Sequence, residues 1–529
     1  MKISDHDLRQ LDAASIHRLV EQQPHAVESL MARLVDDLKE ARERLNQNPN
    51  NSSPPPSTRE PRSRGDVPPP ECPGDSHPEP EVEPEEPEEP KAADASPRQV
   101  PPTKNKRSDG EPRRAGKQPG APGHGRTQAL RITDTLEHRP TQCTRCGAVL
   151  PAERTVGYSG FQEADVVFGT EQHPGLHLTH TQHLLYGCTC LECGHETRAE
   201  PYRAPPATDD WAGVELTAWR LIGPALAALL VWVHFDLHLP VRRCRLLCWE
   251  LFGLSLSVGA IQQALHESGR ACAPIPPRVQ EEVRQAALLY SDETPHYEGT
   301  EFLWLWVLAS AHSVLFFIGR RTKEVLRGRI GTDFAGWLMS DGYGAYREYT
   351  HRLRCWAHLI RKARALAETY TPHVQGYGNT LLDTFDRLIE QVYQAREGPP
   401  CDLRPQLAGE LAELKRLCEK MQRSSNEKAR QLGVEFLNDW EAIFQVLAHP
   451  QMPLTNNFAE RLLRQWVILR RITQGTRTAQ GSLALATFAT IIGTCHLRKA
   501  SPLRYLHRVI AARRQGLPAP ELPPVPALA

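Results

Sequence analysis

The sequence has no net charge, no apolar N-terminal segment and no apolar run long enough to cross a bilayer. Its 529 residues include 63 Lys plus Arg and 63 Asp plus Glu. The first residues, Met1 to Asp7, contain no apolar signal core, so we do not expect secretion. The most apolar window, Leu221 to Phe235, contains Pro224 and is too short for a membrane span. It predicts a buried helix, and we expect a soluble cytoplasmic protein with no membrane partner.

The neutral total hides a separation of charge along the chain. Acidic residues are concentrated in Glu79–Glu89, and basic residues in Lys104–Arg126 and Arg461–Arg477. Because local basic patches determine whether a protein attracts a polyanion, the neutral total does not exclude nucleic acid. The length is sufficient for two to four domains of roughly 150 residues each.

The first segment, residues 1–49, is predicted to be helical. Apolar residues recur mostly at spacings of three, four or seven over residues 6–47. This pattern is compatible with an amphipathic helix packed on its own protein or with a coiled coil that joins two chains. Pro24 interrupts the pattern, and both interpretations remain open at this point.

Residues 50–127 are rich in Pro, Ser and charge, as in Ser53-Pro54-Pro55-Pro56, and predict a disordered linker. The linker ends in a flexible strap in which Gly and Pro prevent regular structure. Its cationic side chains could bind DNA phosphates, although a merely soluble linker is the alternative. The four candidates in the strap are Arg113, Arg114, Lys117 and Arg126.

Two cysteine pairs predict a structural zinc site in residues 128–205. Cys143-x-x-Cys146 and Cys190-x-x-Cys193 are each followed by Gly, and the chain has 13 Cys in all. Four thiolates from two such turns can surround one Zn²⁺ and leave no open position, so the metal would be structural. The gap between the pairs is longer than in a compact zinc ribbon. Cys188 and His195 are alternative ligands.

Residues 206–280 are predicted to be helical. Val241–Gly253 has an amphipathic pattern that ends in Gly, and Ser255 or Ser257 could cap a second helix, Val258–Gly269. Two helices joined by a short turn are compatible with a DNA-binding helix-turn-helix. Plain helical packing is the alternative, because the second helix has few basic residues.

Three apolar runs predict three short strands joined by tight turns, with an acidic residue on the first. The runs are Leu288–Pro295, Phe302–Ala309 and Val314–Ile318, and the first contains Asp292. A carboxylate beside a core is costly to bury unless it binds a cation or another partner. Glu293 should point to the opposite face, because side chains alternate along a strand, so we exclude it from a shared metal site.

The same pattern recurs at Asp341. An apolar run again ends in Ser-Asp within Ala335–Tyr346. If the two strands are neighbours, Asp292 and Asp341 project from adjacent carboxyl ends and could share cations about 3.5–4 Å apart. Glu460 is a third candidate, one turn into a helix that Thr455 or Asn456 could cap. The alternative for Glu460 is a helix-stabilising ion pair with Arg464.

Four motifs in this order resemble the DDE transposases of the bacterial insertion-sequence-66 family. They are Ser291-Asp292-Glu293-Thr294-Pro295, Ser340-Asp341-Gly342-Tyr343, Cys355-Trp356-Ala357-His358-Leu359-Ile360-Arg361-Lys362 and Asn456-Asn457-Phe458-Ala459-Glu460-Arg461-Leu462-Leu463-Arg464. The resemblance extends to the N-terminal helix, the basic strap and the paired cysteines. The chain departs from the pattern at Thr455, where an acidic residue is expected, and in its long linker and stretched zinc segment.

The resemblance implies an α/β fold with a ribonuclease-H-like core in residues 281–510 and a helical insertion at about 363–450. Residues 511–529 are expected to form a Pro-rich tail. The resemblance also implies a catalytic triad of Asp292, Asp341 and Glu460 that binds two Mg²⁺ (or Mn²⁺) ions. The expected activity is cleavage at the ends of an insertion element and joining of the 3′-hydroxyl to target DNA. The expected partners are terminal inverted repeats and target DNA, further copies of the chain, and accessory proteins encoded by the element.

Further residues are expected to line the DNA or to support the site. Trp356 and His358 would support the site or stack on a base, with ordinary packing as the alternative for His358. Asn456 and Asn457 would cap the helix and orient the site. A nuclease or resolvase with the same core, or a non-catalytic DNA-binding protein derived from a transposase, are the alternatives. The basic residues expected along the DNA are Arg461, Arg464, Arg470, Arg471 and Arg477.

Overall fold

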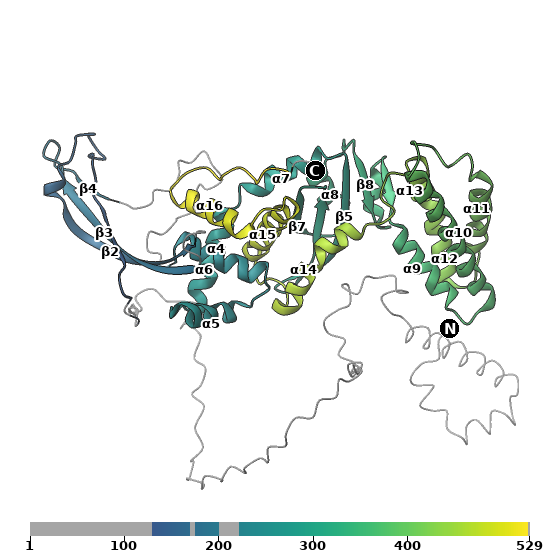
Figure 1. The fold of residues 1–529 in the computed structure, drawn as a ribbon, viewed down its shortest axis with the longest axis horizontal. Coiled ribbons are helices and arrows are strands. Elements are labelled where there is room, and N and C mark those ends of the chain that lie inside the picture. Colours follow the sequence, from purple (N-terminus) through teal and green to yellow (C-terminus); the bar gives the residue numbers. More distant parts are fainter. Residues whose placement is uncertain (1–127, 129, 170–174, 200–221, 527–529) are drawn as a thin grey trace, which may run out of the picture. The chain divides into compact units, whose positions relative to one another are not determined.

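The computed structural model describes residues 128, 130–169, 175–199 and 222–526. In that part the chain is a mixed α/β protein with 13 α-helices, α4 to α16, and two sheets (Figure 1). This agrees with the predicted α/β class. None of the helices there is both long and apolar enough to cross a membrane. The predicted N-terminal helix and linker, with Arg113, Arg114, Lys117 and Arg126, lie outside the described residues.

The predicted zinc segment contains a small sheet with a long hairpin. The order is β1-β3-β2, with β1 parallel to β3 and β2 antiparallel to β3. Strand β4 is antiparallel to the C-terminal end of β3. The hairpin formed by β2 and β3 accounts for the long gap between the two cysteine pairs, which lie at one end of it. The strands are β1 (Asp134–His138), β2 (Val156–Phe168), β3 (Leu176–Thr189) and β4 (Glu196–Arg198), and a 3-10 turn, η2, covers Ala152–Arg154.

Four helices follow, as the sequence predicted. They are α4 (Pro224–Phe235), α5 (Val241–Phe252), α6 (Val258–Ala271) and α7 (Ile275–Arg284). Ten residues of α4 are buried, which confirms the predicted buried helix. The chain leaves α5 at Gly253 in the left-handed region, and the Ser257 hydroxyl accepts a hydrogen bond from the Ala260 amide at 3.0 Å to cap α6.

The hairpin is joined to these helices by buried polar groups. Asp165 on β2 accepts a 2.7 Å hydrogen bond from the backbone N–H of Leu226 at the start of α4. Glu163 on the same strand lies 3.9 Å from Arg514. An N–H of a helix first turn has no partner within the helix, so the Asp165 carboxylate satisfies a group that would otherwise be unpaired.

The larger sheet has five strands in the order β7-β6-β5-β8-β9. The first three form an antiparallel meander, as predicted, while β8 is parallel to β5 and β9 is parallel to β8. The first strand is longer than predicted and continues six residues beyond Asp292 to pair with β6. The strands are β5 (Leu288–Glu298), β6 (Glu301–Ala309), β7 (Val314–Gly319), β8 (Trp337–Ser340) and β9 (Arg352–Arg354); α8 (Lys323–Ile330) and η3 (Gly344–Glu348) connect them.

Helix α15 covers the β7 edge of this sheet. The Thr490 hydroxyl accepts a hydrogen bond from the Phe316 amide at 2.9 Å, and the Thr494 hydroxyl accepts one from the Val314 amide at 3.2 Å. The two threonines are one helical turn apart on α15, and the two amides that they bind are two residues apart on β7. The C-terminal helices are α14 (Asn457–Thr473), α15 (Ala479–Leu497) and α16 (Pro502–Arg514), the last of which extends into the predicted Pro-rich tail.

Five helices occupy the stretch between β9 and α14, where the resemblance implied a helical insertion (Figure 1). Their apolar faces share one core, in which Trp356, Phe385 and Phe436 are almost fully buried. The buried carboxylate of Asp439, between the last two of these helices, pairs with Arg352 at 2.7 Å and Arg354 at 3.2 Å on β9. The helices are α9 (Trp356–Ala367), α10 (Pro372–Arg396), α11 (Ala408–Met421), α12 (Glu427–Asn438) and α13 (Trp440–Ala448).

Candidate active site

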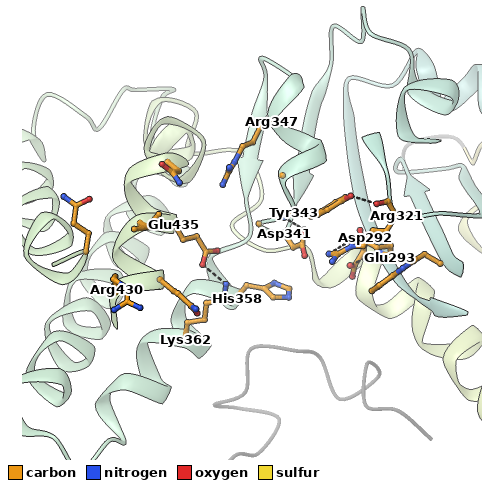
Figure 2. A pocket seen from close by; sticks show the side chains of 17 residues that line it. Asp292, Glu293, Arg321, Asp341, Tyr343, Arg347, His358, Lys362, Arg430 and Glu435 are labelled. Atoms are coloured by element: carbon orange, nitrogen blue, oxygen red, sulfur yellow. Dashed lines mark hydrogen bonds and ion pairs between the residues drawn. The ribbon is translucent and has the colours of Figure 1, made fainter. Parts of the chain in front are cut away.

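Asp292 and Asp341 lie on neighbouring parallel strands. In the register of β5 and β8, Tyr290 pairs with Met339, so Asp292 and Asp341 each come two residues after that pair. Figure 2 shows both carboxylates on the sheet side of one cavity. The expectation that the two aspartates would come from adjacent carboxyl ends agrees with this register.

The surroundings of Asp292 favour a bound cation. Its side chain is buried, and its Oδ1 accepts a 2.9 Å hydrogen bond from the Glu293 amide. Burial, followed by the nearby carboxylates of Glu293, Asp341 and Glu460, raises the pKa of Asp292 well above its usual value. Among the described residues, neither Asp292 nor Asp341 forms an ion pair. A buried aspartate whose pKa is raised by neighbouring acids, and which has no ion-pair partner in the described residues, fits a divalent-cation site.

Glu460 approaches the two aspartates from α14. It lies in the first turn of that helix, as predicted, and burial raises its pKa. Its carboxylate forms an ion pair with Arg361 at 3.4 Å, and its Oε1 lies 3.7 Å from the Nδ1 atom of His358; both residues are on α9. No ion pair with Arg464 occurs in the described part of the chain, so the alternative of a Glu460–Arg464 helix pair is not what the structure shows.

Asn456 connects the start of α14 to the strand that carries Asp292. Its side-chain Nδ2 donates to the Ser291 carbonyl at 2.8 Å, and its backbone N–H donates to the Cys355 thiol at 3.1 Å. The predicted side-chain cap was therefore wrong, because Asn456 occupies the N-cap position without a side-chain cap hydrogen bond. The amide instead holds α14 against β5. Asn457, the first residue of the helix, is exposed.

Glu293 also lines the cavity, although alternation along the strand had led us to set it aside. Its carboxylate lies 2.6 Å from Arg321 Nη2 and accepts a 2.6 Å hydrogen bond from the Tyr346 hydroxyl. Burial and the charge of Asp341 raise the pKa of Glu293 to about 7, against the opposing effect of Arg321. Because Glu293 already has a cationic partner, it differs from Asp292 in its chemistry.

Arg321 was not predicted from the sequence. Its guanidinium lies 4.6 Å from the ring centre of Trp304 and 4.1 Å from that of Tyr343. Two aromatic faces and a carboxylate therefore hold one cation at the edge of the site. Arg321 and Glu293 are 28 residues apart in the sequence and meet only because the strands pair in the sheet, so sequence spacing alone does not predict their contact.

The cavity has a volume of about 840 Å³ and separates the sheet from the inserted helices. Figure 2 shows Lys362, Arg430 and Glu435 facing the two aspartates from α9 and α12. Lys362 pairs with Glu435 at 2.6 Å. The sheet side of the cavity (the acidic wall) thus carries most of the acids and the helix side (the cationic wall) carries Lys362 and Arg430 besides Glu435, an arrangement that can place a phosphodiester between acidic and basic side chains.

Trp356 and His358 have different surroundings. Trp356 is buried against Phe385 and donates its indole N–H to the Ile443 carbonyl at 2.7 Å, so it cannot stack on a base. It supports the site by holding the start of α9. His358 is also buried but lines the cavity, and burial lowers its pKa to about 3.

The basic residues predicted to line DNA do not share one environment. Arg461, Arg464, Arg471 and Arg477 are exposed along α14 and just beyond it. Arg470 is buried instead, and it donates to Thr294 Oγ1 at 3.1 Å and to the Pro295 carbonyl. The prediction for Arg470 does not fit, because its guanidinium is used to hold α14 on β5.

The four predicted cysteine ligands converge. The sulfurs of Cys143, Cys146, Cys190 and Cys193 all lie within 4.8 Å of one another, and the 143–193 and 146–190 pairs are each 3.6 Å apart. Tetrahedral sulfurs around Zn²⁺ with ~2.3 Å bonds lie roughly 3.8 Å apart, whereas a disulfide needs about 2.05 Å. The cluster is thus compatible with zinc.

The two alternative zinc ligands face elsewhere. The Cys188 thiol donates to the Thr189 carbonyl at 3.8 Å, and His195 Nε2 lies 3.1 Å from the Thr144 hydroxyl. Both cysteine turns close through a glycine with positive φ, 76° at Gly147 and 66° at Gly194. The Gly amides donate back to the first cysteine carbonyl of each pair, at 2.9 and 3.0 Å, as the tight turn requires.

Two bacterial proteins are similar to part of this chain. The chain is similar to two proteins of Sinorhizobium fredii (strain NBRC 101917 / NGR234), each described as an uncharacterized protein. It is 25% identical to y4qI over 308 residues, 51% of this chain and 56% of y4qI. It is 26% identical to y4jO over 191 residues, 36% of this chain and 56% of y4jO. The chain thus spans a little over half the length of each relative.

The part of the chain that matches a family model contains the three acidic residues described above. The match covers residues 220–484, half of the chain, from the start of the helices before β5 to the start of α15. The model is described as Transposase IS66 family, and the chain belongs to that family of transposases.

Proposed function

We propose that this chain is a DNA transposase that cleaves the ends of an insertion element and joins the freed 3′-hydroxyl to target DNA. One observation carries the proposal. Asp292 on β5, Asp341 just after β8 and Glu460 on α14 come from separate parts of the chain, and burial together with the neighbouring acids raises the pKa of Asp292 and of Glu460. In the described residues neither aspartate has an ion-pair partner, and a buried carboxylate without one favours a bound cation. The meander followed by two parallel strands supports a ribonuclease-H-like core.

The acidic wall would hold two divalent ions, Mg²⁺ or Mn²⁺, through Asp292, Asp341 and Glu460. Such ions supply an activated water or 3′-hydroxyl and stabilise the leaving oxygen. The protein contributes the geometry. Asn456 fixes α14 on β5 through the Ser291 carbonyl, and Arg361 orders the Glu460 carboxylate through an ion pair at 3.4 Å.

The cationic wall would position the DNA backbone. Lys362 and Arg430 line the cavity opposite the aspartates, where they could bind phosphates on either side of the scissile bond. The exposed residues Arg461, Arg464 and Arg471 would extend this contact along α14. Base-independent contacts of this kind determine register and affinity rather than sequence preference.

The remaining modules fit the same proposal. The cysteine cluster would hold a structural zinc that ties the two knuckles at the end of the β2–β3 hairpin. Helices α5 and α6 would form the element-specific DNA-binding unit, with Arg242, Arg243 and Arg245 exposed on α5. The strap residues Arg113, Arg114, Lys117 and Arg126 are proposed as further phosphate contacts, and the active complex as a homo-oligomer on DNA with any accessory proteins that the element encodes.

A strand-transfer assay tests the proposal. A donor DNA with the element's terminal inverted repeats and a supercoiled target are incubated with the protein and Mg²⁺. Joined products support a transposase, cleavage without joining supports a nuclease or resolvase, and binding alone supports a non-catalytic DNA-binding protein. Asp292→Asn, Asp341→Asn and Glu460→Gln should each reduce the metal-dependent products to the level without protein. The matched control is Glu410→Gln. Glu410 lies on α11 and forms an ion pair with Arg387 on α10, away from the acidic residues, so this variant should keep wild-type activity.

A further inference from the structure

Three residues beside the acidic wall form a second group with metal-binding side chains. One ligand atom each of Cys355, His358 and Glu460 lies within 4.8 Å of the other two. Cys355 directly precedes α9, His358 lies in the first turn of α9, and Glu460 lies in the first turn of α14. The group therefore depends on the contact between two helix starts.

The histidine in this group has a free ligand atom. His358 is 7% exposed, and its Nδ1 has no hydrogen-bond partner among the described residues. The same Nδ1 lies 3.7 Å from Glu460 Oε1, so it points into the group. A buried ring nitrogen without a partner is costly, and most such groups in native proteins have a hydrogen bond, an ordered water or an ion.

The chemistry of the three groups differs from that of the acidic wall. Carboxylates alone suit Mg²⁺, a hard ion that prefers oxygen. A thiolate, an imidazole and a carboxylate together are ligands that Zn²⁺ takes, and three of them leave one position for water or substrate. The acidic wall and the mixed group meet at Glu460, which belongs to both.

We infer that Cys355, His358 and Glu460 form a site for Zn²⁺ or a similar thiophilic divalent cation, separate from the cysteine cluster at residues 143–193. Occupancy of this site fixes Glu460 toward α9 and withdraws it from Asp292 and Asp341. The site therefore inhibits: a thiophilic ion competes with the Mg²⁺-dependent reaction through the carboxylate that both need. This consequence rests on the proposed function, whereas the cation site itself does not.

The first experiment measures binding without activity. The full chain is loaded with Co²⁺ after removal of metal, and thiolate-to-cobalt charge-transfer absorption is titrated. Wild-type protein should bind two thiolate-ligated ions per chain and Cys355→Ala one. His358→Ala should also lose one, and Cys401→Ala, which removes an exposed cysteine elsewhere, should keep two. A single ion in wild-type protein, or two ions in Cys355→Ala, would overturn the inference.

The second experiment measures inhibition. Cleavage of donor DNA in Mg²⁺ is titrated with Zn²⁺, and each variant is normalised to its own rate without Zn²⁺. The Zn²⁺ concentration that halves the rate should rise at least tenfold in Cys355→Ala. An equal Zn²⁺ sensitivity of the two proteins would contradict the inhibitory role. If the wild-type protein shows no cleavage, the proposed function fails, and the cobalt titration still decides whether the site exists.

Discussion

Replacement of Asp439 by Asn should destabilise the contact between the inserted helices and the sheet. The Asp439 carboxylate is fully buried and accepts hydrogen bonds from Arg352 at 2.7 Å and Arg347 at 3.0 Å. Arg354 lies 3.2 Å away and also contacts Glu435. An isosteric amide keeps the shape but loses the negative charge, so the neighbouring guanidinium groups are left with less compensation.

The size of the effect follows from which arginine loses its partner. Removal of one partner from a buried ion pair costs about 3–5 kcal/mol. Arg354 keeps Glu435, and the side chain of Arg347 is 44% exposed, so neither adds much. Arg352 is buried and loses its only carboxylate in the described ion pairs. We therefore expect the lower end, about 3 kcal/mol.

Local hydrogen–deuterium exchange is the suitable assay, because a chain with several units need not unfold in one step. Amides of β9 and α13 should exchange roughly 100-fold faster in Asp439→Asn, which is the kinetic equivalent of about 3 kcal/mol. Arg347→Gln is the control and should change exchange by less than about fivefold, as expected for an exposed pair. Equal exchange in Asp439→Asn and wild type would refute the reasoning.

The pH dependence gives a second measurement on the same residue. Burial alone would raise the pKa of Asp439, but the hydrogen bond from Arg352 and the charges of Arg352, Arg354 and Arg347 hold it below its usual value. A carboxyl whose pKa is lowered by folding contributes stability above its unfolded pKa of about 3.9 and loses it as pH falls through the folded value. Wild-type protein should lose this protection of β9 on acidification below about pH 4, and Asp439→Asn should not.

Three further predictions concern other parts of the chain. Thr490→Val keeps the shape of the side chain but leaves the buried Phe316 amide without its acceptor, so hydrogen–deuterium exchange of β7 should show a loss of about 1–3 kcal/mol in local stability that Thr490→Ser does not share. Burial raises the pKa of Glu163 to about 7, so folded protein holds a proton that unfolded protein releases, and stability should fall as pH rises from about 5 to 8. Glu163→Gln should abolish that fall in a series of thermal melts. Chelation of zinc, or Cys190→Ser, should increase protease cleavage within residues 131–199 while leaving β5–β9 protected, and unchanged cleavage would contradict a structural metal.

The sequence predicted most of the features that depend on local pattern. Apolar runs located the three strands of the meander, and Gly253 with Ser257 marked the helix ends. The convergence of Asp292 and Asp341 followed from a repeated Ser-Asp at the end of an apolar run. Each of these signals is contained in a few neighbouring residues and needs only one assumption about strand order.

The features that were missed depend on contacts between distant segments. Arg470 looked like one more exposed cation, but its place on the helix turns it toward Thr294, 176 residues away. Asn456 looked like a helix cap, yet its amide has a carbonyl of β5 to bind instead. Arg321 was not predicted, because no residue near it in the sequence indicates a contact with Glu293. Side-chain partners across a sheet are decided by packing, which a single sequence does not display.

The threonine-covered edge of the larger sheet limits how this chain can assemble. The N–H groups of Val314 and Phe316, which an incoming strand would need, are already bonded to hydroxyls of α15. At the opposite edge β9 is only three residues long, and its arginines bind carboxylates of the inserted helices. Both edges of the larger sheet therefore offer an incoming strand few free backbone groups, which disfavours growth of this sheet by strand addition. A contact between copies of the chain at this sheet would have to use side chains rather than backbone pairing.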